Sequence, residues 1–196
     1  GNTGLGSNAA RTITTGSYNT AAGTYSLSNV TTSSNNSAFG YQALAENTSG
    51  ASNTAVGTDA LAANTSGAVN VAVGYLALYN NTTASYNNAL GYEALKFNTT
   101  GAHNVAIGKG ALEKNTTASN NTAVGHQALL LNTTGTGNTA VGESNLDSNT
   151  TGTGNTSVGR AAAHQLTTGS YNTIVGHLAG ANNGGLITGS ENSLFG

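Results

Sequence analysis

The chain has 196 residues, but only 5 of them are Lys or Arg and 7 are Asp or Glu, which leaves a formal net charge of −2. So few cations offer no basic surface for a nucleic acid. No apolar run reaches the roughly 20 residues of a membrane-spanning helix. The absence of Cys excludes disulfides and thiolate sites. Large aliphatic residues are scarce enough to suggest disorder, yet disorder normally couples low hydrophobicity to a high net charge. A feature other than bulk hydrophobicity must therefore stabilise the fold of this chain.

The sequence repeats itself almost throughout. The pattern N-x-A-x-G begins at Asn2 and returns every 17 residues as far as Asn172. A further copy begins at Asn192, three residues late, which places a small insertion near residues 182–187. We number the residues of each 17-residue unit as columns one to seventeen, counting from this Asn. The repeat predicts a single domain over residues 1–196, and without capping sequences we expect a fragment of, or a subunit in, a longer fibre.

The first five columns of each unit predict a short strand, because a small apolar run is closed there by Gly. Column four is apolar from Leu5 to Phe195, and column nine is Leu in eight successive units from Leu27 to Leu146. We predict both as core columns. A unit this small cannot bury its own apolar face, so neighbouring units must stack. The expected fold is an all-β parallel β-solenoid of 17-residue coils, with strands about 4.8 Å apart.

Columns eight to twelve allow two interpretations of the turn that follows the strand. Columns eight, nine and twelve have the spacing of one helical turn, and a sharp β-arc is equally compatible with them. Column twelve is Asn from Asn47 to Asn149 but aliphatic in flanking units, as at Val30 and Leu166. Replacement of Asn by aliphatic residues predicts that this column points inward.

Inward-pointing Asn predicts buried ladders, in which each amide bonds to its neighbours and to the turn backbone. We expect the Asn of column one to do the same at the strand entrance. The ladder residues predicted in column one are Asn53, Asn70, Asn87, Asn104, Asn121 and Asn138. Those predicted in column twelve are Asn64, Asn81, Asn98, Asn115 and Asn132. The column-twelve Asn also begin N-T-T or N-T-S sequons, which we interpret as structural, because a buried amide cannot be glycosylated after folding.

Charged residues fall in columns six, seven, ten and eleven, with Glu191 as the exception, which predicts one solvated and variable edge. The strand carries small Ala on one side and a bulkier residue on the other, and a narrow coil cannot bury both faces. We therefore expect self-association, with the second face packed against another copy in a trimer, or with chains joined end to end in a filament.

The runs NTAVGHQAL, NTAVGTDAL and NNALGYEAL, each followed after two residues by NTT or NTS, resemble the repeats of phage tail-fibre proteins. They are also similar, more distantly, to the head repeats of YadA-like trimeric autotransporter adhesins. The resemblance covers nearly the whole chain. It implies a fibre-forming role, an extracellular, cell-surface or virion location, and a left-handed coil such as the β-roll of those adhesins.

The His, Asp and Glu residues that form catalytic sites in hydrolases are scattered along this chain. His126 and His177 share column six but lie three coils apart. Asp59 and Glu93 share column seven two coils apart, about 9–10 Å by strand spacing, which is near the upper limit for inverting glycosidases. We expect both to be exposed and solvated, and two Asp in the whole chain are too few for acidic calcium repeats. We expect no enzyme activity, cofactor or metal.

Two surface features are candidate binding sites. The first is an aromatic patch in columns six, ten and eleven, which would stack on the sugar rings of a cell-surface glycan or simply cover the edge of a thin core. Its residues are Tyr41, Tyr75, Tyr79, Tyr92 and Phe97. The second is the Thr row of column thirteen, which suggests an ice-binding face, although its adjacent Thr-Thr pairs differ from the alternating Thr of such faces. Its residues are Thr65, Thr82, Thr99, Thr116 and Thr133.

The function expected from the sequence is a structural or adhesive segment of an extracellular or viral fibre, with a variable edge for attachment. Ice binding through stacked Thr is the alternative. Neither nucleic-acid binding nor membrane insertion is expected.

Overall fold

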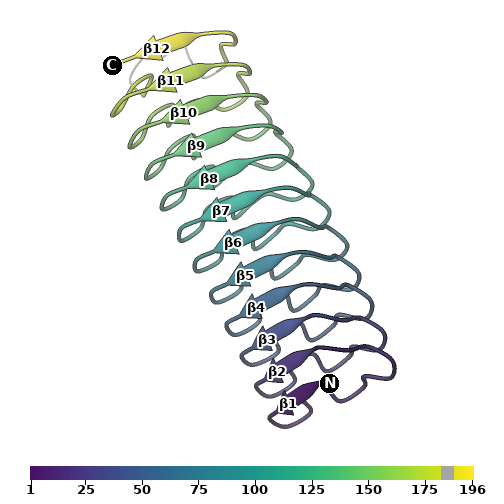
Figure 1. The fold of residues 1–196 in the computed structure, drawn as a ribbon. Helices are drawn as coiled ribbons and strands as arrows, with labels where there is room; N and C mark the ends of the chain where they lie inside the picture. Colours follow the sequence, from purple (N-terminus) through teal and green to yellow (C-terminus); the bar gives the residue numbers. More distant parts are fainter. Residues whose placement is uncertain (182–187) are drawn as a thin grey trace.

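The computed structural model describes residues 1–181 and 188–196, which form a parallel β-solenoid, as the repeat predicts (Figure 1). Each coil contributes one three-residue strand over columns two to four. The strands are β1 (Thr3–Leu5), β2 (Thr20–Ala22), β3 (Ser37–Phe39), β4 (Thr54–Val56), β5 (Val71–Val73), β6 (Asn88–Leu90), β7 (Val105–Ile107), β8 (Thr122–Val124), β9 (Thr139–Val141), β10 (Thr156–Val158), β11 (Thr173–Val175) and β12 (Ser193–Phe195).

The strands pair in sequence order as one parallel sheet from β1 to β12. The register advances by one repeat at each step, so that Ala89 lies beside Ala106 and Ala106 beside Ala123. The last step is longer, because Thr173 of β11 pairs with Ser193 of β12. The predicted insertion near 182–187 lies outside the described residues.

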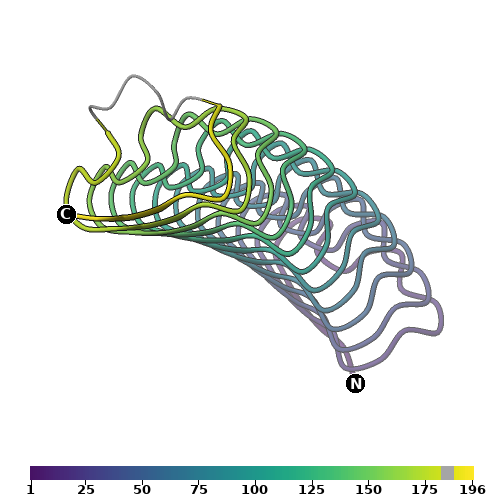
Figure 2. The ribbon, with the colours of Figure 1, turned by 90° about the horizontal axis from the view of Figure 1, so that it is seen from above.

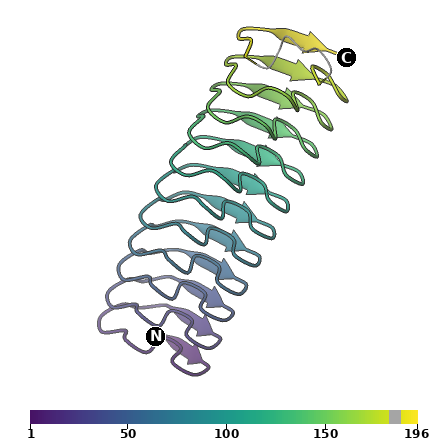
Figure 3. The ribbon, with the colours of Figure 1, turned by 180° about the vertical axis from the view of Figure 1, so that it is seen from behind.

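The coil is left-handed. In Figure 1 the strands lie on the near face and point to the left while the chain rises toward its C-terminus, and Figure 3 shows the same strands from behind. Seen from the C-terminal end in Figure 2, each coil turns clockwise as it approaches the viewer. The same view shows successive coils rotating gradually, which is the twist expected of a parallel sheet.

The described residues contain no helix, so the helical alternative for columns eight to twelve is wrong and the chain turns there as an arc. Column five is Gly with a φ such as 143° at Gly91, and columns seven and nine have left-handed φ, as at Glu93 (57°) and Leu95 (52°). A left-handed residue other than Gly costs about 1–2 kcal/mol. Burying a Leu contributes about 1.5–3 kcal/mol, and Leu95 is completely buried. Burial of Leu95 therefore offsets the strain of its own left-handed conformation.

The small residue of the strand, and not the larger one, faces the interior. Ala89 and Ala106 in column three are 0% exposed, whereas Leu90 and Ile107 in column four are each 40% exposed. Successive strand residues point to opposite faces, and the column-nine Leu leaves room for no more than Ala opposite it. The prediction that column four belongs to the core is thus wrong for the single chain. Columns two and four of β1–β12 form a surface that we call the outer sheet face.

Val69 in column seventeen is a strained β-branched residue. Its φ is 58°, its side chain is exposed, and its N–H donates to the carbonyl of Ala51 in the preceding coil. Because Asn tolerates this conformation much better than Val, we expect Val69→Asn to stabilise the fold by about 1 kcal/mol. The reverse change, Asn120→Val in the same column, should destabilise it by a similar amount. Urea unfolding measures both, and equal midpoints for all three proteins would contradict the assignment.

The Asn side chains of column one form a continuous buried ladder. The main-chain N–H and the Nδ2 of Asn104 both donate to Oδ1 of Asn87, at 3.0 and 3.1 Å. The same Nδ2 donates to the carbonyl of Ala118 at 2.9 Å. The six predicted members of this column are all fully buried, and each donates its main-chain N–H to the Asn of the preceding coil.

Column twelve forms a second buried ladder. Asn98 Nδ2 donates to Oδ1 of Asn81 at 3.0 Å and to the carbonyl of Gly101 at 2.9 Å, and Asn98 Oδ1 accepts from Asn115 at 2.8 Å. The column ends where Leu166 follows Asn149, whose Oδ1 has no partner among the described residues. Apart from the Oδ1 of Asn149, the predicted members of this column lie inside the coil with their amides hydrogen-bonded, as structural residues do.

Candidate functional site: the variable edge

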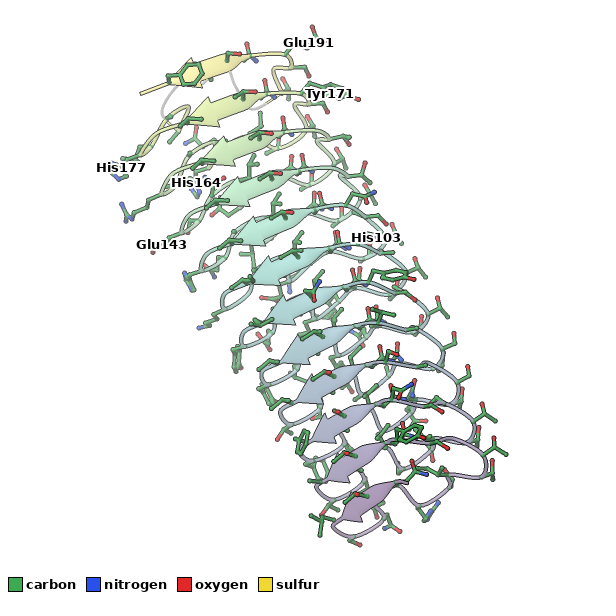
Figure 4. The ribbon with its side chains drawn as sticks, viewed as in Figure 1. His103, Glu143, His164, Tyr171, His177 and Glu191 are labelled. Carbon is green, nitrogen blue, oxygen red and sulfur yellow. The ribbon has the colours of Figure 1, made fainter. Side chains whose placement is uncertain are left out.

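Columns six, seven, ten and eleven project outward from the arc, because the left-handed residues direct columns eight and nine into the core. We call these outward columns the variable edge. Figure 4 shows His177, His164 and Glu143 on this side of the rod, and His103, Tyr171 and Glu191 of column seventeen on the opposite side. Eleven of the twelve charged residues lie on the variable edge, so chemical variety is concentrated on one side of a uniform scaffold.

Two of the predicted aromatic residues form a stack. The rings of Tyr75 and Tyr92 in successive coils lie 5.3 Å apart at 29°. Lys109 in the next coil of the same column places its ammonium 5.7 Å from the Tyr92 ring centre. Both rings are nearly half exposed. No ion pair is formed by Lys109 among the described residues, so this short row presents two aromatic faces and a free cation.

The remaining predicted aromatic residues lie elsewhere on the edge. Tyr41 meets Tyr25 edge to face, with ring centres 6.5 Å apart. Tyr79 lines a small pocket with Gln42 and Glu46, of about 150 Å³. Phe97 belongs to a further group with Lys96 and Lys114. The predicted patch is therefore four separate groups rather than one surface.

Phe97 stands at one end of a shallow groove of about 550 Å³. The groove runs between columns eleven and thirteen, and its other lining residues are Lys114, Thr116, Leu131, Thr133 and Thr150. The ammonium of Lys114 lies 4.4 Å from the Phe97 ring centre, and that of Lys96 lies 5.1 Å from it. Both cations are paired, Lys114 with Glu113 and Lys96 with Glu93, so the groove presents apolar surface and no free charge.

The charged residues of the last coils pair from one coil to the next. Arg160 bonds Glu143 at 3.2 Å on one side and His177 at 3.2 Å on the other. His164 lies 2.6 Å from Asp147. Burial raises the pKa of Asp147 although His164 acts to lower it. Burial is the larger of the two effects on this carboxyl.

The two carboxylates of column seven have different surroundings. Glu93 pairs with Lys96 at 2.8 Å, and this hydrogen bond raises the pKa of Lys96. Asp59 has no partner among the described residues, and partial burial raises its pKa. The described part of the chain contains no group of three or more His, Cys, Asp or Glu placed to hold a metal ion.

The predicted ice-binding Thr residues are engaged in a third ladder. The hydroxyl of Thr99 donates to the carbonyl of Thr116 at 3.0 Å, and the hydroxyl of Thr116 to that of Thr133 at 3.2 Å. Thr65, Thr82 and Thr133 make the same bond to the next coil. The exposed hydroxyl row is instead column fourteen, as at Thr100 and Thr117.

Several contacts were not anticipated from the sequence. Tyr86 and His103 in column seventeen stack with ring centres 4.9 Å apart at 7°, and Lys109 lies over the ring of Tyr92. The one available signal was the repeat itself, because residues 17 positions apart become neighbours. Applied to every aromatic and cationic residue, that spacing would have found Tyr86 with His103 and Tyr92 with Lys109.

Comparisons with protein-family models, with curated proteins and with solved structures gave no significant match to this chain. Among the described residues, no helix has the length and apolar character required to cross a membrane.

Proposed function

We propose that the chain is a structural and adhesive segment of an extracellular or viral fibre, a rigid spacer that presents a variable edge for attachment, and that it is not an enzyme. The observation that carries this proposal is the contrast between the uninterrupted sheet from β1 to β12 and the concentration of eleven of the twelve charged residues on one edge. A scaffold with chemical variety on one side suits display better than catalysis, which requires several groups to converge.

The stacked ladders account for the rigidity that a spacer needs. Each coil is tied to the next by strand hydrogen bonds, the column-one Asn ladder and a Thr ladder, and the coils from Asn47 to Asn149 are joined by the second Asn ladder as well. Eleven steps of about 4.8 Å give a rod on the order of 50 Å long. In a solenoid each coil contacts only its neighbours, so length grows in proportion to coil number without a change in fold.

Attachment is assigned to the row formed by Tyr75, Tyr92 and Lys109. Exposed Tyr rings supply flat apolar faces for the non-polar side of a sugar ring, and the free Lys109 ammonium supplies a donor for a hydroxyl or carboxylate. The ligand class that fits this row is a cell-surface glycan. A spacer with such a row would operate outside the cell or on a virion, where it meets such glycans.

The test is binding of the purified chain to an array of neutral and acidic oligosaccharides. The double variant Tyr75→Ser with Tyr92→Ser should lose at least tenfold in affinity. The matched control is Tyr18→Ser with Tyr171→Ser, which changes two tyrosines that are still more exposed, at 72% and 64%, but lie in column seventeen. Absence of binding to any oligosaccharide, or an equal loss in the control, would contradict the proposal.

Ice binding is the second function proposed, because column fourteen presents an exposed Thr or Ser in every described coil. Thermal hysteresis of the same purified chain distinguishes the two functions. Hysteresis that disappears in the double variant Thr100→Lys with Thr117→Lys, in a chain that binds no oligosaccharide, would favour ice binding.

A further inference from the structure

The outer sheet face is apolar, exposed and free of charge. Column four contributes aliphatic or aromatic side chains, among them Phe39, Leu90 and Ile107, each at least 40% exposed. Column two contributes mostly Thr. None of the twelve charged residues lies in either column. An exposed apolar surface of this extent on a soluble protein usually marks a contact site.

The face has a distinct apolar centre on β5, β6 and β7. Here alone column two changes from Thr or Ser to Val71 and Val105, with the exposed Asn88 between them. The surrounding column-four residues are Val73, Leu90 and Ile107. On either side of this centre, β4 and β8 return to Thr54 and Thr122 in column two. An apolar centre with a more polar rim is the composition of protein–protein interfaces.

We infer that a second copy of this chain packs on the outer sheet face, with Asn88 of one copy opposite Asn88 of the other. This inference names the partner of a surface that the proposed attachment site does not use. The absence of charge supports a second copy, because two identical faces meet without like-charge repulsion. In column two, Val71 and Val105 lie at equal distances on either side of Asn88, so a two-fold axis through β6 places Val71 of one copy opposite Val105 of the other.

Asn88 sets the register of this contact. Opposite another Asn88, its amide donates to and accepts from an identical group, so both are satisfied. If the copies slip by one coil, Asn88 faces Val71 or Val105 and is buried without a partner, which is unfavourable. A single polar residue in an apolar contact fixes register in coiled coils for the same reason.

The area of the face predicts a weak association that depends on concentration. A face about 50 Å long and about 10 Å wide has roughly 500 Å² of surface, so a pair buries on the order of 1,000 Å². Specific interfaces usually bury about 1,200–2,000 Å² in total. Even contact along the whole sheet stays slightly below this range, so one pair should associate weakly, and only in a register that keeps most of the sheet in contact.

The test is disulfide cross-linking of Asn88→Cys under mild oxidation. The matched control is Thr100→Cys, which places a Cys at another exposed position, in column fourteen and away from the outer sheet face. We expect Asn88→Cys to form cross-linked dimers at least tenfold faster, and the added change Ile107→Lys to reduce this rate to that of the control. Sedimentation of the unmodified chain should show mass rising above the monomer with concentration.

Equal cross-linking rates for the two Cys variants, or a monomer at all concentrations, would overturn the inference. Oligosaccharide binding by the Ile107→Lys variant separates the two proposals. If that binding persists while association is absent throughout, the outer sheet face is not a self-contact, but the attachment edge stands.

Discussion

The substitution Gly91→Ala is expected to destabilise the fold by about 3–5 kcal/mol, one of the largest effects of any single change in this chain. Gly91 closes strand β6 with a φ of 143°, a conformation that is essentially restricted to Gly. An added Cβ would lie 2.5 Å from the carbonyl oxygen of Gly108 and 2.6 Å from its carbon. These backbone atoms belong to the next coil and cannot move without breaking the sheet. Thermal unfolding followed by circular dichroism measures the loss.

Gly137→Ala is the control for this prediction. Gly137 also has a positive φ, 68°, but an added Cβ would meet nothing within 4 Å. Column seventeen already accepts Tyr, Asn and Ser elsewhere. The control should lose about 1 kcal/mol, the ordinary cost of a left-handed Ala. Equal losses for the two variants would show that coil-to-coil contact at column five is not tight.

The substitution Asn98→Asp should destabilise the fold by about 3–5 kcal/mol at neutral pH. It keeps an acceptor for Asn115 but removes the two donors that Asn98 supplies to Asn81 and to Gly101. A buried carboxylate then faces two oxygen atoms. Burial disfavours the ionised form and raises the pKa of the new carboxyl in the folded state. The variant is therefore most stable below the ordinary pKa of Asp and loses stability as pH rises through the folded value.

Asn120→Asp makes the same chemical change at an exposed position of the neighbouring coil. We expect its free energy of unfolding to stay within about 0.5 kcal/mol of that of the parent, with little dependence on pH. Unfolding measured at acidic and neutral pH compares the two variants. A pH-independent midpoint for Asn98→Asp would mean that its side chain has left the ladder for solvent.

The repeat was sufficient to predict the coil, the strand columns and the chain's parallel sheet. The repeat predicted whether a side chain points inward or outward only in columns where residues of different polarity replace one another from coil to coil. Asn47 and Asn149 give way to Val30 and Leu166, and a position that accepts both an amide and an aliphatic side chain must be enclosed. The confinement of charge to four columns likewise identified an outward edge.

Direction could not be predicted where both faces of the strand are apolar. Ala89 and Leu90 are adjacent, and nothing in periodicity shows that the smaller one faces the core. That outcome depends on the width of the coil, which the left-handed residues set. Leu95 is a poor choice for such a backbone by local preference, so its conformation follows from packing and not from propensity. The repeat predicted which columns form the candidate site, but not which of their side chains touch. Tyr75 and Tyr92 stack on each other, whereas Tyr79 lies in a separate pocket.

The measurement that tests the account most directly is the stability of a chain lacking residues 87–103, one complete coil. If the fold is a stack of 17-residue coils, Asn70 then lies below Asn104 and every column remains aligned. We expect unchanged circular dichroism per residue and an unfolding midpoint within a few degrees of the parent. Deletion of residues 87–95, which removes fewer residues but breaks the register, should abolish cooperative unfolding. Equal damage from both deletions would contradict the stacked-coil account.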